Sequence, residues 1–274
     1  MKKVFKLILL SLLLAIIVYI AFLFLFKPSN DRDWKTPKEI LAYADINGNE
    51  ITIYNIRNFN YRSNDDYDIN YYDKKFDLNK LQSVDFILEP FSKFSGLAHT
   101  FLSFGFEDNE YVSISVETRN EKDEEYSIIK GLFNQYEIMY IVADEKDVVK
   151  LRSNYRNDKV YIYPAKTTKE KKQALFLNMI NRLNKLKDQP EFYNTLTNTC
   201  TTNIVRHINT ISPKKIPFSY KVLLPGYAAE LAFDLGLIDT DLTLKEAMDM
   251  FLINDRALKY ADDPDFSTKI RTIE

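Results

Sequence analysis

Residues 98–119, AHTFLSFGFEDNEYVSISVETR, decide the fold of this chain. Every second residue from 100 to 106 and from 112 to 116 is apolar, apart from Thr100. Alternation with a period of two on both sides of the polar triplet 107–109 predicts two antiparallel strands joined by a three-residue loop. The apolar residues of both strands must face one side of the sheet, because a shift of a single residue would turn one set to the opposite face.

This register pairs residues that are distant in sequence. It places Phe104 opposite Val112, and His99 opposite Glu117. Side chains paired across two strands have Cβ atoms about 5 Å apart, so the imidazole is within hydrogen-bonding reach of the carboxylate. Such a carboxylate fixes the tautomer of a histidine and stabilises its charged form. A polar pair beside a core, with no catalytic role, gives the same pattern, so other residues have to decide between the two.

Outward from this hairpin, the chain divides into a strand-rich part and a helix-rich part. Residues 60–79, full of Asp, Asn and Tyr, predict a loop. From residue 167 the apolar residues recur with a helical period, and the chain ends in a polar tail. Strands followed by helices indicate a single α+β domain. The predicted strands are residues 50–59, 84–89, 99–106, 111–117, 137–143 and 160–163, and the predicted helices are residues 167–189, 198–209, 228–235 and 244–252.

The first thirty residues predict a membrane anchor. Three lysines precede residues 7–26, an uncharged run of about 20 residues that is long enough to cross a hydrocarbon core of about 30 Å. The run ends in bulky residues, which favours an uncleaved anchor over a cleavable signal peptide, and no cysteine follows it directly, which excludes lipid attachment there. We expect residues 1–30 to form the anchor of a single-pass protein of the bacterial inner membrane, with a cytoplasmic N-terminus. Residues 31–274 are then one periplasmic domain. A short linker at residues 28 to about 37 leads into it, and we expect Trp34 in this linker to pack at the membrane interface or in the core.

Charge and composition exclude several classes of protein. The formal net charge is −2, and without the four lysines in positions 2–27 the remainder carries −6. This acidic balance argues against a nucleic-acid binder and against a domain held on anionic lipid by charge alone. A single cysteine excludes an intramolecular disulfide, and two histidines beside it leave no Cys/His zinc cluster. We expect no metal and no cofactor.

The sequence TNTCTTNI at 197–204 surrounds the lone cysteine with hydroxyl and amide residues where a helix is expected to start. Thr197, Asn198 or Thr199 would serve as the N-cap, which places Cys200 in the first turn. There the helix dipole lowers the pKa of a thiol, and unpaired backbone N–H groups can hold an oxyanion. A small buried cysteine is the plain alternative, although an oxidising compartment disfavours a thiol that has no task.

Of the two histidines, His99 is the better partner for this cysteine. His207 lies seven residues beyond Cys200, about 10 Å away along one helix, which is too far for a hydrogen bond. We therefore expect His207 to be a packing or surface residue. His99 comes from a different part of the chain, so the fold is free to bring it to Cys200. The order along the chain is then base, orienting acid and nucleophile.

A histidine on one strand, a polar partner on the next and a later cysteine that opens a helix resemble the circularly permuted papain-like fold of cell-wall amidases and lecithin–retinol acyltransferases. Several phrases resemble the bacterial family named for the Lnb N-terminal periplasmic domain. The resemblance extends from about residue 34 to about residue 270, and the namesake proteins are linked to lipoprotein N-acylation and carry additional membrane segments. The phrases are NIRNF with YRS in 55–63, AHT with FGF in 98–106, SVETR in 115–119, YN in 193–194 and NTCTTN in 198–203.

The resemblance implies a thiol enzyme with Cys200 as nucleophile, His99 as base and Glu117 as orienting residue. Its chemistry would be acyl transfer or acyl hydrolysis through a Cys200 acyl-enzyme, with membrane lipid or lipoprotein as substrate. Cations and amides could bind phosphate or carboxylate groups of that substrate, and the cations are equally well explained as structural ion-pair partners. These candidate substrate-binding residues are Arg57, Arg62, Arg119 and Asn198.

Two other classes of function stay open. The first is a thiol peptidase or amidase that acts on peptidoglycan peptides, which a broad polar groove would favour over an apolar channel. The second is a non-catalytic periplasmic binding module, for which an aromatic share of 14% offers ample contact surface.

Overall fold

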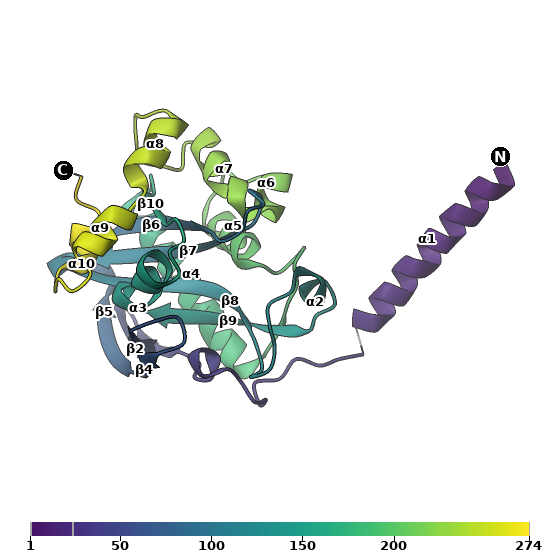
Figure 1. The fold of residues 1–274 in the computed structure, drawn as a ribbon, viewed down its shortest axis with the longest axis horizontal. Coiled ribbons are helices and arrows are strands. Elements are labelled where there is room, and N and C mark those ends of the chain that lie inside the picture. Colours follow the sequence, from purple (N-terminus) through teal and green to yellow (C-terminus); the bar gives the residue numbers. More distant parts are fainter. Residues whose placement is uncertain (1, 24, 274) are drawn as a thin grey trace.

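A nine-stranded sheet forms the centre of the fold in the computed structural model, which describes residues 2–23 and 25–273 (Figure 1). Its strands follow the order β1-β2-β9-β8-β7-β6-β10, with β5 paired to β2 and β11 paired to β9. The pairs are antiparallel except for β2 and β9, which run parallel. The strands are β1 (Tyr43–Asn47), β2 (Glu50–Arg57), β5 (Tyr71–Asp77), β6 (Leu81–Pro90), β7 (Ala98–Phe106), β8 (Glu110–Arg119), β9 (Tyr136–Ala143), β10 (Tyr161–Pro164) and β11 (Phe192–Tyr193), and β3 (Asn60–Tyr61) pairs separately with β4 (Tyr67–Asp68).

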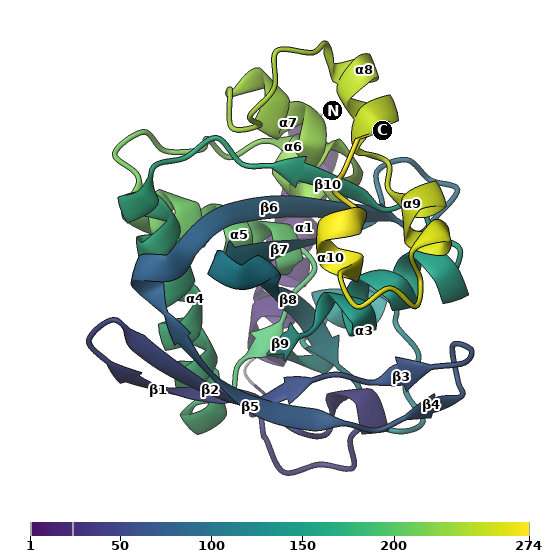
Figure 2. The same ribbon diagram turned by 90° about the vertical axis from the view of Figure 1, so that its left-hand side faces the viewer.

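Helices cover both faces of this sheet (Figure 2). One face carries α4 (Lys169–Asp188) and α5 (Cys200–Ile211). The other face carries α3 (Glu145–Lys150), α9 (Asn254–Lys259) and α10 (Phe266–Lys269), and a π-helical turn at Leu151–Tyr155 continues α3. The remaining helices are α1 (Lys2–Leu23), α2 (Ile128–Leu132), α6 (Tyr220–Leu223), α7 (Ala228–Asp234) and α8 (Leu244–Phe251). The described part of the chain is thus an α+β domain with an N-terminal apolar helix.

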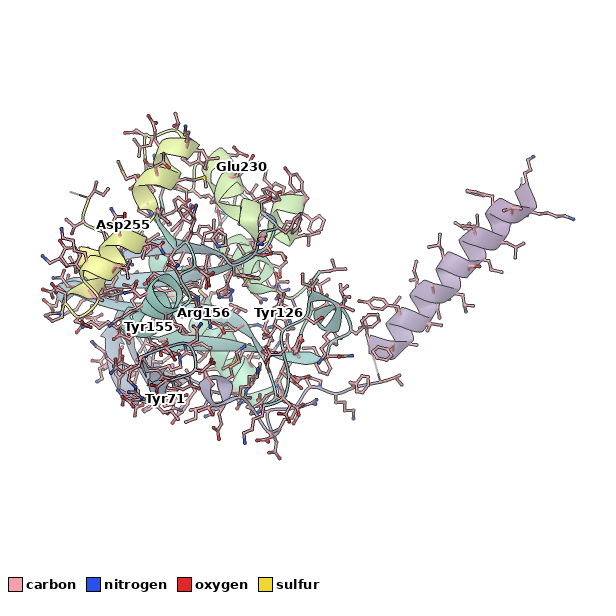
Figure 3. All side chains as sticks on the ribbon, in the orientation of Figure 1. Tyr71, Tyr126, Tyr155, Arg156, Glu230 and Asp255 are labelled. Atoms are coloured by element: carbon pink, nitrogen blue, oxygen red, sulfur yellow. The ribbon has the colours of Figure 1, made fainter. Side chains whose placement is uncertain are left out.

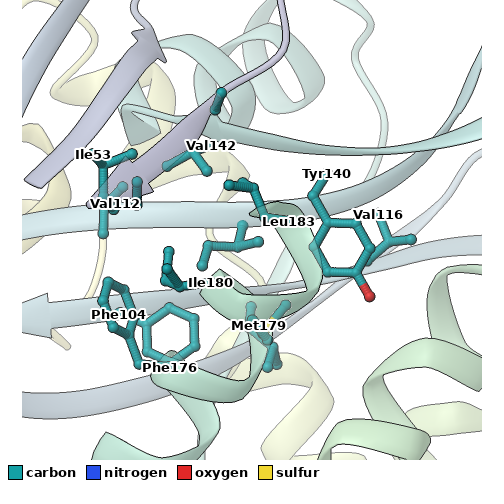
Figure 4. Packing of buried hydrophobic residues seen from close by; sticks show 14 of the residues in the cluster. Ile53, Phe104, Val112, Val116, Tyr140, Val142, Phe176, Met179, Ile180 and Leu183 are labelled. Carbon is teal, nitrogen blue, oxygen red and sulfur yellow. The ribbon is translucent and has the colours of Figure 1, made fainter. Parts of the chain in front are cut away.

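The main core lies between α4 and the sheet (Figure 4). Phe176, Ile180 and Leu183 recur on one face of α4 and are buried, as their helical spacing predicts. Phe176 meets Phe104 of β7 edge to face, with ring centroids 5.0 Å apart. Full burial of one such side chain is worth about 1.5–3 kcal/mol, which fixes α4 firmly against the hairpin.

The β7–β8 hairpin has the predicted register. Phe104 pairs with Val112, and the loop Glu107–Asn109 joins the two strands. Asp108 and Asn109 adopt φ values of 62° and 59° in this loop. Asp and Asn tolerate that left-handed conformation better than most residues. The alternation of apolar residues was therefore sufficient to place the two strands residue by residue.

Two predictions from the sequence were wrong. Residues 60–79 are not a loop, because they contain β3, β4 and β5. Strand β5 lies at an edge and leaves most of its polar side chains in solvent while it buries Phe76, so its strand pattern is concealed by Asp and Lys. The C-terminal segment is not a polar tail either. It forms α9 and α10, and Phe266 and Ile270 are fully buried in the second core.

The anchor and linker agree with the sequence. Helix α1 covers most of the predicted run 7–26, with residue 24 outside the described residues, and is long and apolar enough to span a membrane. Trp34 in the linker is only 4% exposed and its ring lies 4.2 Å from the Arg119 guanidinium. The linker is therefore fastened to the domain by a buried aromatic side chain.

Candidate functional site

Three ionisable side chains lie in a row on neighbouring strands. Glu89 of β6 pairs in register with His99 of β7. The register of the hairpin brings Glu117 of β8 to the other side of His99, where its Oε1 lies 3.9 Å from the His99 Nε2 atom. The structure therefore places Glu117 beside His99, as the alternation of apolar residues predicted.

Ser115 connects the two groups. Its hydroxyl lies 2.7 Å from His99 Nε2 and donates a 3.0 Å hydrogen bond to Glu117 Oε1. A hydroxyl has a single hydrogen, so the His99 Nε2 atom must carry a proton and donate it to Ser115. This arrangement leaves the Nδ1 atom of His99 as the basic nitrogen, and no side chain of the described residues hydrogen-bonds to it. The expected direct hydrogen bond is thus replaced by a relay.

Arg152 holds the two carboxylates on either side of the histidine. It reaches the sheet from the π-helical turn, donates from Nε to Glu89 at 2.5 Å and from a terminal nitrogen to Glu117 at 2.9 Å. Its guanidinium also lies over the ring of Phe101, which stacks on the His99 ring. Because Arg152 itself is only 3% exposed, this clamp is rigid and largely removed from water.

The environment sets the charge of each group. Burial, aided by the positive charge of Arg152, lowers the pKa of His99 to about 4, although Glu117 acts in the opposite direction. Burial disfavours the charged form of Glu117, yet Arg152 and Lys38 outweigh it and hold the pKa of this carboxyl well below its ordinary value. His99 is therefore neutral near pH 7 beside an ionised Glu117. The sequence predicted that the carboxylate would stabilise a charged imidazole, but burial and Arg152 have the larger effect on the His99 pKa.

Cys200 opens α5, as its hydroxyl-rich surroundings predicted. Thr199 is the N-cap, and a reciprocal capping box joins it to Thr202. The backbone N–H groups of Cys200 and Thr201 lie in the first turn, where a helix has no internal acceptors for them. The Cys200 side chain is 5% exposed, and its sulfur lies 3.8 Å from the Thr201 hydroxyl.

A single hydrogen bond brings the two halves of the site together. The hydroxyls of Thr100 on β7 and Thr201 on α5 are 2.9 Å apart, and both residues are buried. These threonines directly follow His99 and Cys200 in the sequence. The start of α5 is therefore fastened to β7 at the residue next to the histidine.

Cys200, His99 and Glu117 line one cavity of about 240 Å³. Figure 3 labels Tyr126 and Arg156, two more of its lining residues. The cavity is lined by both charged and apolar side chains. The charged side chains are Lys38, Glu89, Glu117, Arg152 and Arg156, and the apolar ones are Phe91, Leu97, Ala98, Val116, Ile128, Leu223 and Pro225.

Among the described residues no hydrogen bond joins the Cys200 sulfur to the His99 imidazole, and the sulfur lies beside the Thr201 hydroxyl. The Oε1 atom of Glu89 is buried, lies 3.6 Å from Arg156 and has no hydrogen-bond partner among the described residues. A buried carboxylate oxygen without a donor is unusual.

Comparison with known sequences assigns the family. A family model described as the Lnb N-terminal periplasmic domain matches residues 67–226, which contain His99, Ser115, Glu117 and Cys200. The chain belongs to this family. No curated protein and no solved structure matches it. Together with α1, the match identifies a membrane-anchored Lnb periplasmic domain, as predicted.

The structure gives the three predicted substrate-binding arginines protein partners. Arg57 lines a neighbouring cavity, but its guanidinium forms a two-pronged ion pair with buried Asp147. Arg119 donates to the carbonyls of Lys38 and Glu39, and Arg62 is paired with exposed aspartates outside the cavity. All three arginines therefore have direct contacts with protein groups, which favours their interpretation as structural ion-pair partners over substrate binding.

Asn198 and His207 also have local roles. The Asn198 amide donates to the Phe192 carbonyl and its oxygen accepts from Asn203, which shapes the turn before Cys200. His207 is buried between Tyr140 and Asn178, at 2.7 Å and 2.6 Å, and is a packing residue. Neither side chain lines the cavity.

Sequence reasoning missed four residues that shape the site: Glu89, Arg152 and Arg156 line the cavity, and Ser115 contacts His99 and Glu117. Ser115 carried a signal, because it stands between His99 and Glu117 on the same face of the hairpin. Glu89, Arg152 and Arg156 gave none, since their positions depend on how β6 and the turn after α3 meet the hairpin. Within residues 2–23 and 25–273, no group of three or more His, Cys, Asp or Glu side chains is arranged to hold a metal ion.

Proposed function

We propose that this Lnb domain is a membrane-anchored Cys–His thiol enzyme that transfers or hydrolyses acyl groups of lipid or lipoprotein substrates. The observation that carries the proposal is the shared cavity: Cys200 at a helix start and a neutral, oriented His99 form parts of its wall. The apolar side chains that line the cavity suit an acyl chain better than a polar peptide. The order of His99, Glu117 and Cys200 along the chain supports a circularly permuted papain-like arrangement.

The first half of the reaction forms a thioester. The Cys200 sulfur attacks the carbonyl carbon of an ester or amide, and its proton passes to His99 Nδ1, directly or through one water molecule. The negative charge that develops on the carbonyl oxygen is stabilised by the N–H groups in the first turn of α5. When the tetrahedral intermediate collapses, the bond to the leaving alcohol or amine breaks, and His99 returns the proton to that leaving group.

The second half releases the acyl group. His99 Nδ1 takes a proton from a water molecule or an amine, which attacks the thioester carbon. The carbon–sulfur bond breaks, the sulfur recovers its proton, and a carboxylic acid or an amide leaves. Because His99 is neutral near pH 7, it is ready to act as a base in both halves, and Ser115 and Glu117 keep its Nε2 proton in place.

Detection of the thioester tests this proposal. The full-length chain in lipid nanodiscs is incubated with phospholipid that carries isotope-labelled acyl chains, and separately with muropeptide. Peptide mass spectrometry then looks for an acyl mass on Cys200 that hydroxylamine removes. We expect the adduct with phospholipid, no adduct in Cys200→Ala, and none above background in His99→Ala with an unchanged melting temperature.

Other results would overturn the proposal. An adduct formed only with muropeptide would assign peptidase or amidase chemistry. Full turnover by the Cys200→Ala variant would exclude Cys200 as the nucleophile, and no adduct or turnover with either substrate would leave a binding module.

A further inference from the structure

Large apolar side chains project into solvent from the three segments that flank the Cys200 cavity. Six of them form what we call the apolar rim, and each is between 37% and 79% exposed. Single exposed apolar residues are ordinary on a protein surface, but several around one opening indicate a contact surface. The apolar rim consists of Phe91, Phe94, Ile128, Ile129, Phe218 and Tyr220.

The rim residues come from three parts of the chain, each of which supplies residues to the cavity wall or contacts a segment that does. Phe91 from the β6–β7 loop and Ile128 from α2 both line the cavity. The β6–β7 loop also contacts the segment after α6, where the Ser95 hydroxyl lies 3.0 Å from the Tyr227 hydroxyl. Tyr220 of α6 packs edge to face against Tyr227. The loop, α2 and α6 therefore surround one opening.

The membrane anchor leaves the domain at this same edge. The hydroxyl of Tyr19, near the end of α1, donates to the Leu132 carbonyl of α2 at 2.7 Å. The rings of Tyr19 and Phe22 both pack edge to face on Phe133, each at 5.5 Å. Figure 1 shows α2 and α6 on the side of the domain that faces α1. The end of the membrane-spanning segment and the rim are thus parts of one surface.

We propose that the apolar rim lies in the interfacial layer of the membrane that α1 spans, in the leaflet on the side of the domain, so that the Cys200 cavity opens directly toward membrane lipid. Aromatic rings are favoured at the boundary between headgroups and acyl chains, and aliphatic side chains gain by leaving water there. The domain without its N-terminal lysines has a net charge of −6, so apolar contact and the tether supply the binding. The inference deepens the proposed function by naming the route of the substrate, yet rim insertion does not require any chemistry at Cys200.

Fluorescence quenching by lipid tests the position of the rim. The only native tryptophan, Trp34, is buried and gives a constant background. Phe94→Trp and Phe218→Trp are compared with Ile69→Trp, an exposed position next to β4, which Figure 1 draws on the side away from α1. Each full-length variant also carries Cys200→Ala, and is placed in nanodiscs of phosphatidylcholine and phosphatidylglycerol with or without bromine at acyl positions 6 and 7.

We expect brominated lipid to remove more than about half of the added emission at positions 94 and 218 and almost none at position 69. Equal quenching at all three positions, or none at 94 and 218, overturns the inference. Because the Cys200→Ala background has no nucleophile, this result is independent of whether the thioester experiment succeeds. Far-ultraviolet circular dichroism and a melting temperature that match the parent chain show that each variant is folded.

Discussion

The imidazole of His99 reaches the carboxylate of Glu117 through the hydroxyl of Ser115. The two hydrogen bonds of this relay measure 2.7 Å and 3.0 Å, whereas the direct distance from the His99 ring to Glu117 is 3.9 Å. The relay assigns the proton to Nε2 and frees Nδ1 for the reaction. A serine that does not touch the substrate thus decides which nitrogen of the histidine is basic.

Replacement of Ser115 tests the relay. Ser115→Ala leaves the Nε2 atom without its acceptor, so we expect acyl turnover to fall by at least about tenfold because the wrong tautomer becomes populated. Ser113→Ala is the matched control, since the Ser113 hydroxyl is also buried on β8 but has no hydrogen-bond partner among the described residues. The measurement is kcat with labelled phospholipid, together with the melting temperature. Equal activity of the two variants would contradict a role for the relay.

The pH profile of turnover tests the state of His99. Burial and Arg152 lower the pKa of His99 to about 4, so its neutral form persists well below pH 6. We expect the acid limb of kcat/KM to have its midpoint near pH 4 and not near the ordinary histidine value of about 6.5. The rate is measured from pH 3.5 to 8 at constant ionic strength. A midpoint near 6.5 would mean that a solvated histidine, and not the buried His99, is the base.

Stability should fall on acidification for the same reason. His99 and His207 both have a pKa lowered to about 4 by burial, whereas an unfolded chain holds histidines of pKa about 6.5. Between these values the unfolded state binds more protons, so the free energy of unfolding is largest above pH 6.5 and declines toward pH 4. Each histidine contributes about 1.4 kcal/mol per pH unit. Thermal melting from pH 7.5 to 4 measures the decline, and His207→Gln should reduce its slope without moving the activity profile.

The sequence predicted the two halves of the site separately. Strict alternation predicted the register that places Glu117 beside His99, because a one-residue shift would have turned Phe104 or Val112 away from the core under α4. Hydroxyl residues before Cys200 marked the helix start, and Thr199 is indeed its N-cap. Both signals are local, since each depends on a few neighbouring residues.

The rest of the site depends on contacts between distant segments. Arg152 reaches Glu89 and Glu117 only because the turn after α3 packs on the sheet face that carries the row. No pattern in the sequence near residue 152 predicts these contacts. The misjudged C-terminal segment shows the same limit, since Phe266 and Ile270 are separated by polar residues and only the second core shows why they are buried.

Arg156 is the cavity cation with the fewest ties to the protein. Its side chain is 43% exposed and its contact with Glu89 is 3.6 Å long. If it meets the substrate, Arg156→Ala should raise KM for phosphatidylglycerol by about tenfold, change kcat little and leave the melting temperature unchanged. Arg62→Ala is the control, because Arg62 is an exposed cation in an ion pair away from the cavity. An unchanged KM, or an equal rise for an uncharged diacylglycerol, would argue against recognition of a phosphate by Arg156.

Variants of Arg57 distinguish a structural role of this residue from a substrate-binding role. Its side chain is 5% exposed, and its guanidinium makes hydrogen bonds of 2.8 Å and 2.7 Å to Asp147. The Asp147 carboxylate also accepts from the backbone N–H of Phe59. Arg57→Met leaves that charge buried without a partner, so we expect a loss of about 3–5 kcal/mol in the free energy of unfolding. The double variant Arg57→Met, Asp147→Asn removes both charges, and the asparagine oxygen can still accept from Phe59.

The double variant should therefore recover most of the lost stability, and its acyl turnover at low temperature should equal that of the parent chain. Chemical denaturation of the detergent-solubilised full chain measures the first quantity, and the labelled-phospholipid assay measures the second. A substrate-binding arginine would behave in the opposite way. The double variant would then be stable but would show a raised KM, because no group would replace the guanidinium that had held the substrate.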